Sequence, residues 1–297
     1  MTNKIYDIVL FHYPCQDGLA SAWVIHRYMY ESLQNQIELY PIQHGKIINL
    51  DRLTNKRVIF CDYAPSKEIL DQIEKVTKKI TILDHHISSQ KALEHKPYAI
   101  FDMTKSGVGL TWEYFFPDKQ MPLFLKMIQD RDIWTWKIEN SREFTSGFTT
   151  VCSGIEMYDF NLLFELFNEL YDEDNLKKFK FYIKIGSIIN NSIMLKCKYM
   201  ALEHLKKINK YKDSNVCIVN CSSELSSDLG NILASSDTVD FAALWRYNHT
   251  KEEYYVSLRS NNKVDVSLIA KEFGGGGHKN ASGFATKINP IILLSSR

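Results

Sequence analysis

Residues 78 to 88 read KKITILDHHIS, an alternating β-branched run that leads directly into an aspartate and two adjacent histidines. Such a run, bounded by polar residues, is typical of a buried β-strand. Side chains alternate across a strand, so Asp84, His85 and His86 cannot all face the core, and at least two should point into a crevice above the sheet. The stretch therefore predicts an α/β fold with ligand-binding side chains at the carboxyl end of a strand.

The segments before this stretch have the same organisation. Strand-like runs alternate with amphipathic, helix-like stretches, at residues 5–11, 19–33, 37–42, 57–63 and 66–76. This alternation is typical of βαβ units on a parallel sheet with helices on both faces. His12 ends the first strand-like run and Asp62 ends the third, so polar side chains from several strands should gather at one edge of the sheet.

The pattern changes after residue 105. Residues 106–130 have the pattern of two helices separated by a turn at Pro117 and Pro122, and the segment from about 158 to 208 is helical in pattern almost throughout. From Asn215 onward strands and helices alternate again, which predicts a smaller mixed-sheet α/β domain. We therefore divide the chain into an N-terminal parallel-sheet domain at 1–185, a helical linker at 186–212 and a C-terminal domain at 213–297.

Composition narrows the class of protein. The chain has 297 residues, 36 Lys+Arg and 35 Asp+Glu, so its net charge of +1 gives no overall field for a general binder of nucleic acid or membrane. The apolar run near the N-terminus is too short for a signal sequence, and no segment is apolar enough to span a membrane. The six cysteines form no CxxC pair, which favours a reducing environment. We expect a cytoplasmic protein without a membrane partner.

Carboxylates and imidazoles occupy comparable positions at the ends of four segments: Asp17, Asp62, the triplet Asp84–His86 and the pair Asp130 and Asp132. Such a group would repel itself unless a divalent cation lay within it. Its carboxylate and imidazole ligands suit manganese, magnesium or iron better than structural zinc. Two such ions could activate a shared water and hold a phosphoryl group. Each carboxylate alone could equally be a helix cap or a solvated loop residue, so the prediction depends on the four segments together.

A second candidate site lies in AKEFGGGGHKNASGF, residues 270 to 284. Four consecutive glycines allow backbone N–H groups to approach an anion closely, and His278 and Lys279 add positive charge. The spacing fits neither a Rossmann nor a P-loop motif. Arg259, at the end of the strand-like VSLRS, offers a planar guanidinium that suits phosphate. The alternatives are a flexible turn and an ordinary surface arginine.

Together these motifs resemble those of the DHH phosphoesterase superfamily with a C-terminal DHHA1 domain. The matching segments are HYPCQDGLASA, FCDYAPS, LDHH, IQDRD and VSLRS…VDVSLIAKEFGGGGHKNASGF, which cover nearly the whole chain in order. The resemblance implies a metal-binding catalytic DHH domain at 1–185 and a substrate-binding DHHA1 domain at 213–297. The short HxxCxDG form is most similar to the nanoRNase and cyclic-nucleotide phosphodiesterase branch. The implied activity is manganese-dependent hydrolysis of phosphoester bonds in short oligonucleotides or small nucleotides, by a water that the metal activates.

The resemblance also assigns roles to residues. His12 and Asp62 would hold one of two Mn²⁺ ions, with Mg²⁺ or Fe²⁺ as alternatives, and the second ion would be held by Asp17, Asp62, His85 and Asp130. Asp62 would bridge the two ions, His86 would polarise the scissile phosphate, and Asp84 would orient a histidine. In the DHHA1 domain the remainder of the substrate would be bound by Arg259, Gly275, Gly276, Gly277 and His278.

Two positions leave alternatives open. Much of the family has an aspartate where this chain has Cys15, which would either ligate the first metal as a thiolate or leave that metal loosely held; the other motifs disfavour a thiol nucleophile. Asp130 is preferred over Asp132 as a ligand because it follows the apolar pair of MIQD.

Three functions therefore remain. They are a phosphodiesterase or exonuclease acting on short substrates, a degenerate member that binds nucleotide or short RNA without hydrolysis, and a polyphosphate or pyrophosphate hydrolase. A long nucleic acid is not expected, because the sequence has no extended basic track interleaved with aromatic residues. A homodimer is compatible with the sequence.

Overall fold

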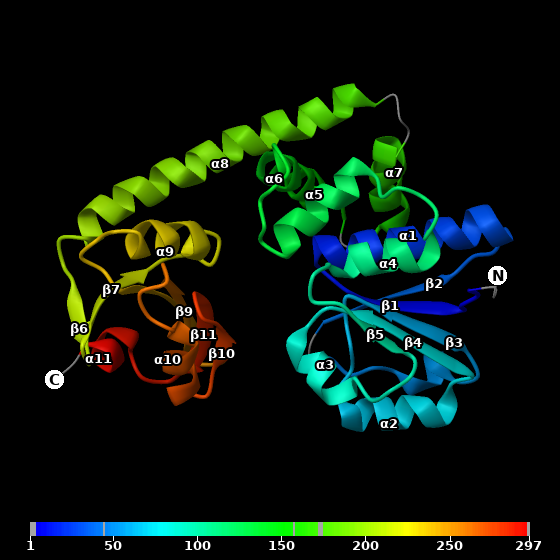
Figure 1. The fold of residues 1–297 in the computed structure, drawn as a ribbon, viewed down its shortest axis with the longest axis horizontal. Coiled ribbons are helices and arrows are strands. Elements are labelled where there is room, and N and C mark those ends of the chain that lie inside the picture. The colour runs from blue at the N-terminus through cyan, green and yellow to red at the C-terminus, as the bar shows by residue number, and fades with distance from the viewer. Residues whose placement is uncertain (1–3, 44, 157, 172–174, 296–297) are drawn as a thin grey trace. The chain divides into compact units, whose positions relative to one another are not determined.

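Apolar, β-branched runs in the first half of the chain form a five-stranded sheet in which every neighbouring pair is parallel (Figure 1). The strand order is β2-β1-β3-β4-β5, and the strands are β1 (Ile8–His12), β2 (Glu38–Ile42), β3 (Arg57–Cys61), β4 (Lys79–Asp84) and β5 (Ala99–Phe101). The structure, a computed structural model, describes residues 4–43, 45–156, 158–171 and 175–295. It divides the chain into two units, Met1–Ile188 and Ile189–Arg297.

Helices cover both faces of this sheet, because alternate strand residues point to opposite sides. Val9 and Phe11 pack into the larger core, whereas Ile8 and Leu10 pack into the smaller one. The larger core is completed by α1 (Gln16–Leu33), α4 (Gly107–Phe115), α5 (Leu123–Asp132), α6 (Ser141–Ser153) and α7 (Phe160–Tyr171). The smaller core is completed by the 3₁₀ helix η1 (Leu50–Leu53), α2 (Lys67–Val76) and α3 (Ile87–Leu93). Figure 1 shows α1 and α4 on one side of the sheet and α2 and α3 on the other.

A long helix, α8 (Leu176–His204), contains the boundary between the two units. In its first half, the buried side chain of Tyr182 belongs to the larger core of the first unit. In its second half, the buried residues Cys197 and Ala201 belong to a core of the second unit. Each half of the helix is therefore an integral part of the unit in which it lies.

The second unit contains a six-stranded mixed sheet in the order β10-β11-β9-β8-β7-β6. The β7–β8 pair is parallel and the other pairs are antiparallel. The strands are β6 (Asn209–Tyr211), β7 (Ser214–Asn220), β8 (Phe241–Asn248), β9 (Glu253–Ser260), β10 (Gly276–His278) and β11 (Ala281–Thr286). The helices are α9 (Ser226–Ala234), α10 (Val266–Glu272) and α11 (Pro290–Leu294).

The predicted fold class is confirmed, since a parallel-sheet unit with helices on both faces is followed by a smaller mixed-sheet unit. Within the described ranges, no helix combines the length and the apolar character that crossing a bilayer requires.

Candidate metal centre

The polar side chains that the sequence singled out lie at one edge of the parallel sheet. Strands β1, β3 and β4 are neighbours and run in the same direction, so their carboxyl ends meet at that edge. His12 is the last residue of β1, Asp62 follows β3, and Asp84 ends β4. Helix α1 begins just after the first of these strands and carries Asp17 in its first turn. The fold thereby brings together residues that lie far apart in the sequence.

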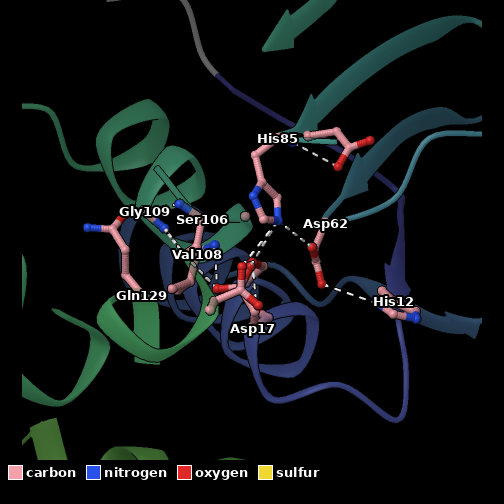
Figure 2. A network of polar contacts seen from close by, with 12 residues as sticks. His12, Asp17, Asp62, His85, Ser106, Val108, Gly109 and Gln129 are labelled. Atoms are coloured by element: carbon pink, nitrogen blue, oxygen red, sulfur yellow. Dashed lines mark hydrogen bonds and ion pairs between the residues drawn. The ribbon is translucent and has the colours of Figure 1, made fainter. Parts of the chain in front are cut away.

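Asp62 lies between two histidines, as Figure 2 shows. Its Oδ1 is 3.2 Å from Nε2 of His85, and its Oδ2 is 3.5 Å from Nδ1 of His12. The residue has a φ of 53°, in the left-handed region, and its N–H donates to the carbonyl of Leu83. The backbone of the neighbouring strand therefore helps to fix a carboxylate whose two oxygens face opposite sides of the cluster.

Asp17 is held by the start of α4. Its Oδ1 accepts hydrogen bonds from the Ser106 hydroxyl at 2.7 Å and from the Val108 N–H at 3.1 Å (Figure 2). Its Oδ2 lies 4.0 Å from Nε2 of His85. One oxygen thus anchors the side chain while the other faces the cluster.

Asp84 and His86 form a hydrogen-bonded pair next to Asp62 and His85, and ligand atoms of all four residues lie within 4.8 Å of one another. Asp84 is fully buried, and its Oδ1 lies 2.7 Å from Nδ1 of His86 and accepts the N–H of His85 at 2.8 Å. The side chain of His86 is 39% exposed. Because Asp84 occupies one edge of the imidazole, the ring is held with its opposite edge, which carries Nε2, directed away from that carboxylate.

The structure places Asp132 within the cluster and Asp130 outside it. Oδ2 of Asp132 lies 3.3 Å from Nε2 of His85, within the cluster. The Asp130 carboxylate instead accepts hydrogen bonds from the turn that follows α5, namely from the Thr135 and Ser141 hydroxyls and the N–H groups of Lys137 and Ile138. The position after an apolar pair, on which the preference for Asp130 depended, does not distinguish the two aspartates, since Asp17 and Asp62 of the cluster are equally buried.

The electrostatics of the cluster are those expected of a cation site. Burial, together with the charges of Asp132 and Asp62, raises the pKa of Asp17 well above its usual range. Burial alone would raise the pKa of Asp62, but its contact with His85 and neighbouring charges lower it to about 2. Burial alone would lower the pKa of His85, but its contact with Asp62 and neighbouring charges raise it to about 9. Three carboxylates thus surround one imidazole nitrogen, which cannot donate to all of them.

The donor set fits a divalent metal. Asp17 Oδ2 and Asp62 Oδ2 are buried, and neither has a hydrogen-bond partner within the described part of the chain. Ligand atoms of His12, Cys15 and Asp62 lie within 4.8 Å of one another, and so do those of Asp17, His85 and Asp132. Carboxylate and imidazole ligands of this kind suit Mn²⁺, Mg²⁺ or Fe²⁺. Asp62, a member of the first group, also contacts His85 of the second, so it lies between the two groups.

Cys15 is the residue just before α1, and its thiol belongs to the group around His12. Burial raises the pKa of this thiol, and the charges of Asp62 and Asp17 raise it further. The side chain is therefore a neutral thiol at pH 7 in the metal-free protein, which agrees with the argument against a thiolate nucleophile.

Arg259 and His278 occupy paired positions of the C-terminal sheet. Arg259 in β9 lies opposite Ala281 in β11, which lies opposite His278 in β10. Directly paired residues point to the same face, so the two side chains share one face of the sheet. The Arg259 guanidinium donates to the Ser227 hydroxyl of α9 at 3.0 Å, and burial lowers its pKa. His278 is exposed.

The glycine run is more ordered than an open anion loop. Gly275 donates its N–H to the carbonyl of Ala270, and this hydrogen bond lies at the C-terminal end of α10. This N–H is therefore engaged within the fold, and the assignment of the glycine run to substrate binding stays a prediction. Gly276 and Gly277 belong to β10, where Gly277 has a φ of 138° and a Cβ at that position would lie 2.6 Å from Cα of Ser282. Glycine is needed there because β10 and β11 approach so closely.

Sequence reasoning missed the residues that position Asp17. Ser106 caps α4, accepting from the Gly109 N–H, and its backbone N–H donates to Gln129 (Figure 2). The only signal in the sequence was a serine before a helix-like stretch. Such a serine indicates a helix cap, but it does not indicate that its hydroxyl also binds Asp17.

Together, the fold and the cluster describe an α/β protein with a candidate metal site at the carboxyl edge of its parallel sheet. A sequence profile of the DHHA1 domain matches residues 215–290. The uncharacterized protein R106 of Acanthamoeba polyphaga mimivirus is 39% identical over 293 residues, covering 94% of this chain and 67% of the relative. The chain belongs to the DHH/DHHA1 phosphoesterase superfamily.

Two further similarities agree with this assignment. The 3′,5′-cyclic-nucleotide phosphodiesterase of Helicobacter pylori is 23% identical over 266 residues, covering 75% of this chain and 72% of the relative. The structure of a pGpG-specific phosphodiesterase from Vibrio cholerae matches 98% of this chain and 96% of its own, with a TM-score of 0.50 and 13% identity. The second similarity supports the fold, and a phosphoesterase function is supported at the level of the family.

Proposed function

We propose that the protein is a metal-dependent phosphodiesterase that hydrolyses short oligonucleotides or small nucleotides. The observation that carries this proposal is the position of Asp62, whose two oxygens face His85 on one side and His12 on the other. Asp62 belongs to the group around His12 and contacts His85 of the group that contains Asp17 and Asp132, and a carboxylate between two groups of ligands is the arrangement that a pair of metal ions requires.

The residues beside the metal groups would act on the phosphate. When bound, the metal ions would supply a nucleophilic water at neutral pH and Lewis-acid polarisation of the phosphoryl oxygen. The hydrogen bond with Asp84 raises the pKa of His86, so its imidazole carries positive charge at a higher pH than an ordinary histidine does. A charged His86 would stabilise the negative charge that develops on the phosphoryl oxygens, and Asp84 would keep its ring in position.

Several observations favour a small substrate. The net charge of +1 provides no broad attraction for a polyanion. In the DHHA1 unit Arg259 and His278 share one sheet face, and one guanidinium beside one imidazole suits one or two phosphates and not a long backbone. A curated relative is a 3′,5′-cyclic-nucleotide phosphodiesterase, so cyclic nucleotides belong among the substrates to test.

A second candidate is a protein that binds nucleotide without hydrolysing it. The observation that favours it is Cys15, which places a neutral thiol beside His12 and Asp62 where a carboxylate would add charge. A site that holds only one ion would lack the second metal ion of the pair that the proposed hydrolysis uses.

Hydrolysis by chelator-stripped protein with and without added Mn²⁺ tests the proposal. The substrates are an RNA dinucleotide, a five-residue RNA, 3′,5′-cyclic AMP, a cyclic dinucleotide, adenosine bisphosphate and pyrophosphate. Asp62→Asn should abolish turnover, whereas Asp71→Asn, an exposed carboxylate on α2, should not. Turnover of none of these substrates, with one ion or fewer per chain, would support the binding protein instead.

A further inference from the structure

A cavity of about 460 Å³ lies beside the metal groups, within the first unit. Its wall includes Cys15, Asp17 and Asp132, which are three of the residues that could hold metal. The rest of the wall comes from the start of α1, the last turn of α5 and helices α6 and α7. A substrate with its phosphate at the metal groups would thus have a cavity of ligand size next to that phosphate.

One part of the wall is aromatic. Trp134 is 55% exposed, although large aromatic side chains are usually buried, and its ring meets that of Trp136 edge-on at 4.9 Å. Its backbone has a φ of 58°, and its N–H donates to the Arg131 carbonyl. Tyr13 also lines the cavity, and its ring packs against Phe160 at 5.4 Å. Two aromatic side chains are therefore available for contact with a planar group.

The polar part of the wall offers hydrogen-bond donors. Arg131 donates from Nη1 to the side-chain oxygen of Gln16 at 3.0 Å and to the Thr149 hydroxyl at 3.2 Å, which fixes its guanidinium. Gln16 Nε2 is buried and has no hydrogen-bond partner among the described residues. An amide group left in this state costs free energy unless a ligand accepts from it. Gln16 and Arg131 thus place N–H donors in the wall of the cavity.

We propose that this cavity binds the nucleobase of the nucleotide whose phosphate lies at the metal centre, and that it prefers guanine to adenine. The inference rests on the proposed function and specifies its substrate. Guanine presents two acceptors, O6 and N7, along one edge, whereas adenine presents a donor beside N7. Trp134 stacks on the base, and Gln16 and Arg131 donate to its acceptor edge. Phosphate alone would not use the aromatic wall.

Steady-state kinetics of the metal-loaded protein test this role. The substrates are 5′-phosphorylated GpG and ApA, with bis(p-nitrophenyl) phosphate as a diester that has no nucleobase. Trp134→Ala should raise KM for the GpG substrate about fivefold or more. Gln16→Leu should remove most of the preference for GpG over ApA, a change of about tenfold. In both variants kcat/KM should fall more for the GpG substrate than for bis(p-nitrophenyl) phosphate, and an equal fall for the two substrates would overturn the role of the cavity in binding the base. Tyr30→Ala, which removes an exposed aromatic side chain outside the cavity, is the control.

Binding without turnover separates this inference from the proposed function. Equilibrium dialysis of GMP, AMP and ribose 5-phosphate against the full chain should give the tightest binding for GMP, weakened in Trp134→Ala. Equal binding of GMP and ribose 5-phosphate, or an unchanged KM in both variants, would overturn the cavity's role while leaving hydrolysis intact. Failure of the wild-type protein to hydrolyse any diester would contradict the proposed function alone, and GMP binding that depends on Trp134 would still support the cavity.

Discussion

Exchanging Asp130 or Asp132 for asparagine should separate the stability of the fold from the binding of metal. The two aspartates are two positions apart at the end of α5, yet the structure gives them different roles. We expect Asp130→Asn to lower the melting temperature with little change in metal affinity per folded molecule. We expect Asp132→Asn to weaken metal binding and turnover with little change in the melting temperature.

The magnitudes follow from the hydrogen bonds. Each oxygen of Asp130 accepts one backbone N–H and one hydroxyl, at distances from 2.5 to 3.1 Å. Asparagine keeps only one acceptor oxygen, so two of these bonds are lost, and one backbone N–H and one hydroxyl lose their acceptor. At about 1–2 kcal/mol for each lost bond, the free energy of unfolding falls by about 2–4 kcal/mol. For a unit of this size the melting temperature then falls by about 5–15 °C.

Asp132 contacts His85 at 3.3 Å, and burial raises its pKa, so its charge is not stabilised in the metal-free protein. Removing that charge should change the free energy of unfolding by less than about 0.5 kcal/mol. Loss of a direct ligand should weaken metal binding by about 100-fold or more, because even residues outside the ligand shell contribute about 10–100-fold.

Thermal unfolding of metal-free protein and Mn²⁺ titration by calorimetry measure the two effects on the same samples. The reasoning would be refuted by the reverse result, in which Asp130→Asn binds metal poorly at an unchanged melting temperature and Asp132→Asn unfolds early but binds normally.

Three further predictions concern the same cluster. Cys15→Asp should tighten binding of the weaker Mn²⁺ ion by about tenfold, because it adds a negative charge beside His12 and Asp62. An unchanged Mn²⁺ titration would count against Cys15 as a neighbour of the metal. Gly107→Ala should reduce metal affinity and turnover, since the new Cβ would lie 2.6 Å from Cβ of Asp62. Gly154→Ala should change neither, because its Cβ would meet only a carbonyl oxygen at 3.3 Å. Equal effects of the two substitutions would exclude the steric explanation. Mn²⁺ affinity should rise about tenfold per pH unit from pH 6 to 8, because His85, with a pKa of about 9, must lose its proton before it can bind the metal. The same Mn²⁺ affinity at every pH would contradict the role of His85 as a ligand.

The part of the metal cluster that comes from the ends of neighbouring parallel strands could be predicted from the sequence. In a parallel sheet the residues that follow neighbouring strands must meet, so His12, Asp62 and His85 could be brought together from hydrophobic patterning alone. Asp17 followed from its place in the first turn of a helix after such a strand. These are consequences of secondary structure and not of detailed packing.

The remaining details depend on local backbone geometry that patterning does not specify. Trp134 and Trp136 both have positive φ values, and the turn that they help to form directs the N–H groups of Lys137 and Ile138 to Asp130. No sequence rule indicates left-handed tryptophans, so the choice between Asp130 and Asp132 could not be made from sequence. Likewise, a glycine run does not reveal that Gly275 uses its N–H to end a helix.

Counting bound Mn²⁺ in wild-type and Asp62→Asn protein, while dinucleotide hydrolysis is followed, tests directly whether Asp62 joins two metal groups in one phosphodiesterase centre. We predict close to two ions per chain and turnover for the wild-type protein, and at most one ion and no turnover for the variant. Undiminished Mn²⁺-dependent hydrolysis by correctly folded Asp62→Asn protein would contradict the account.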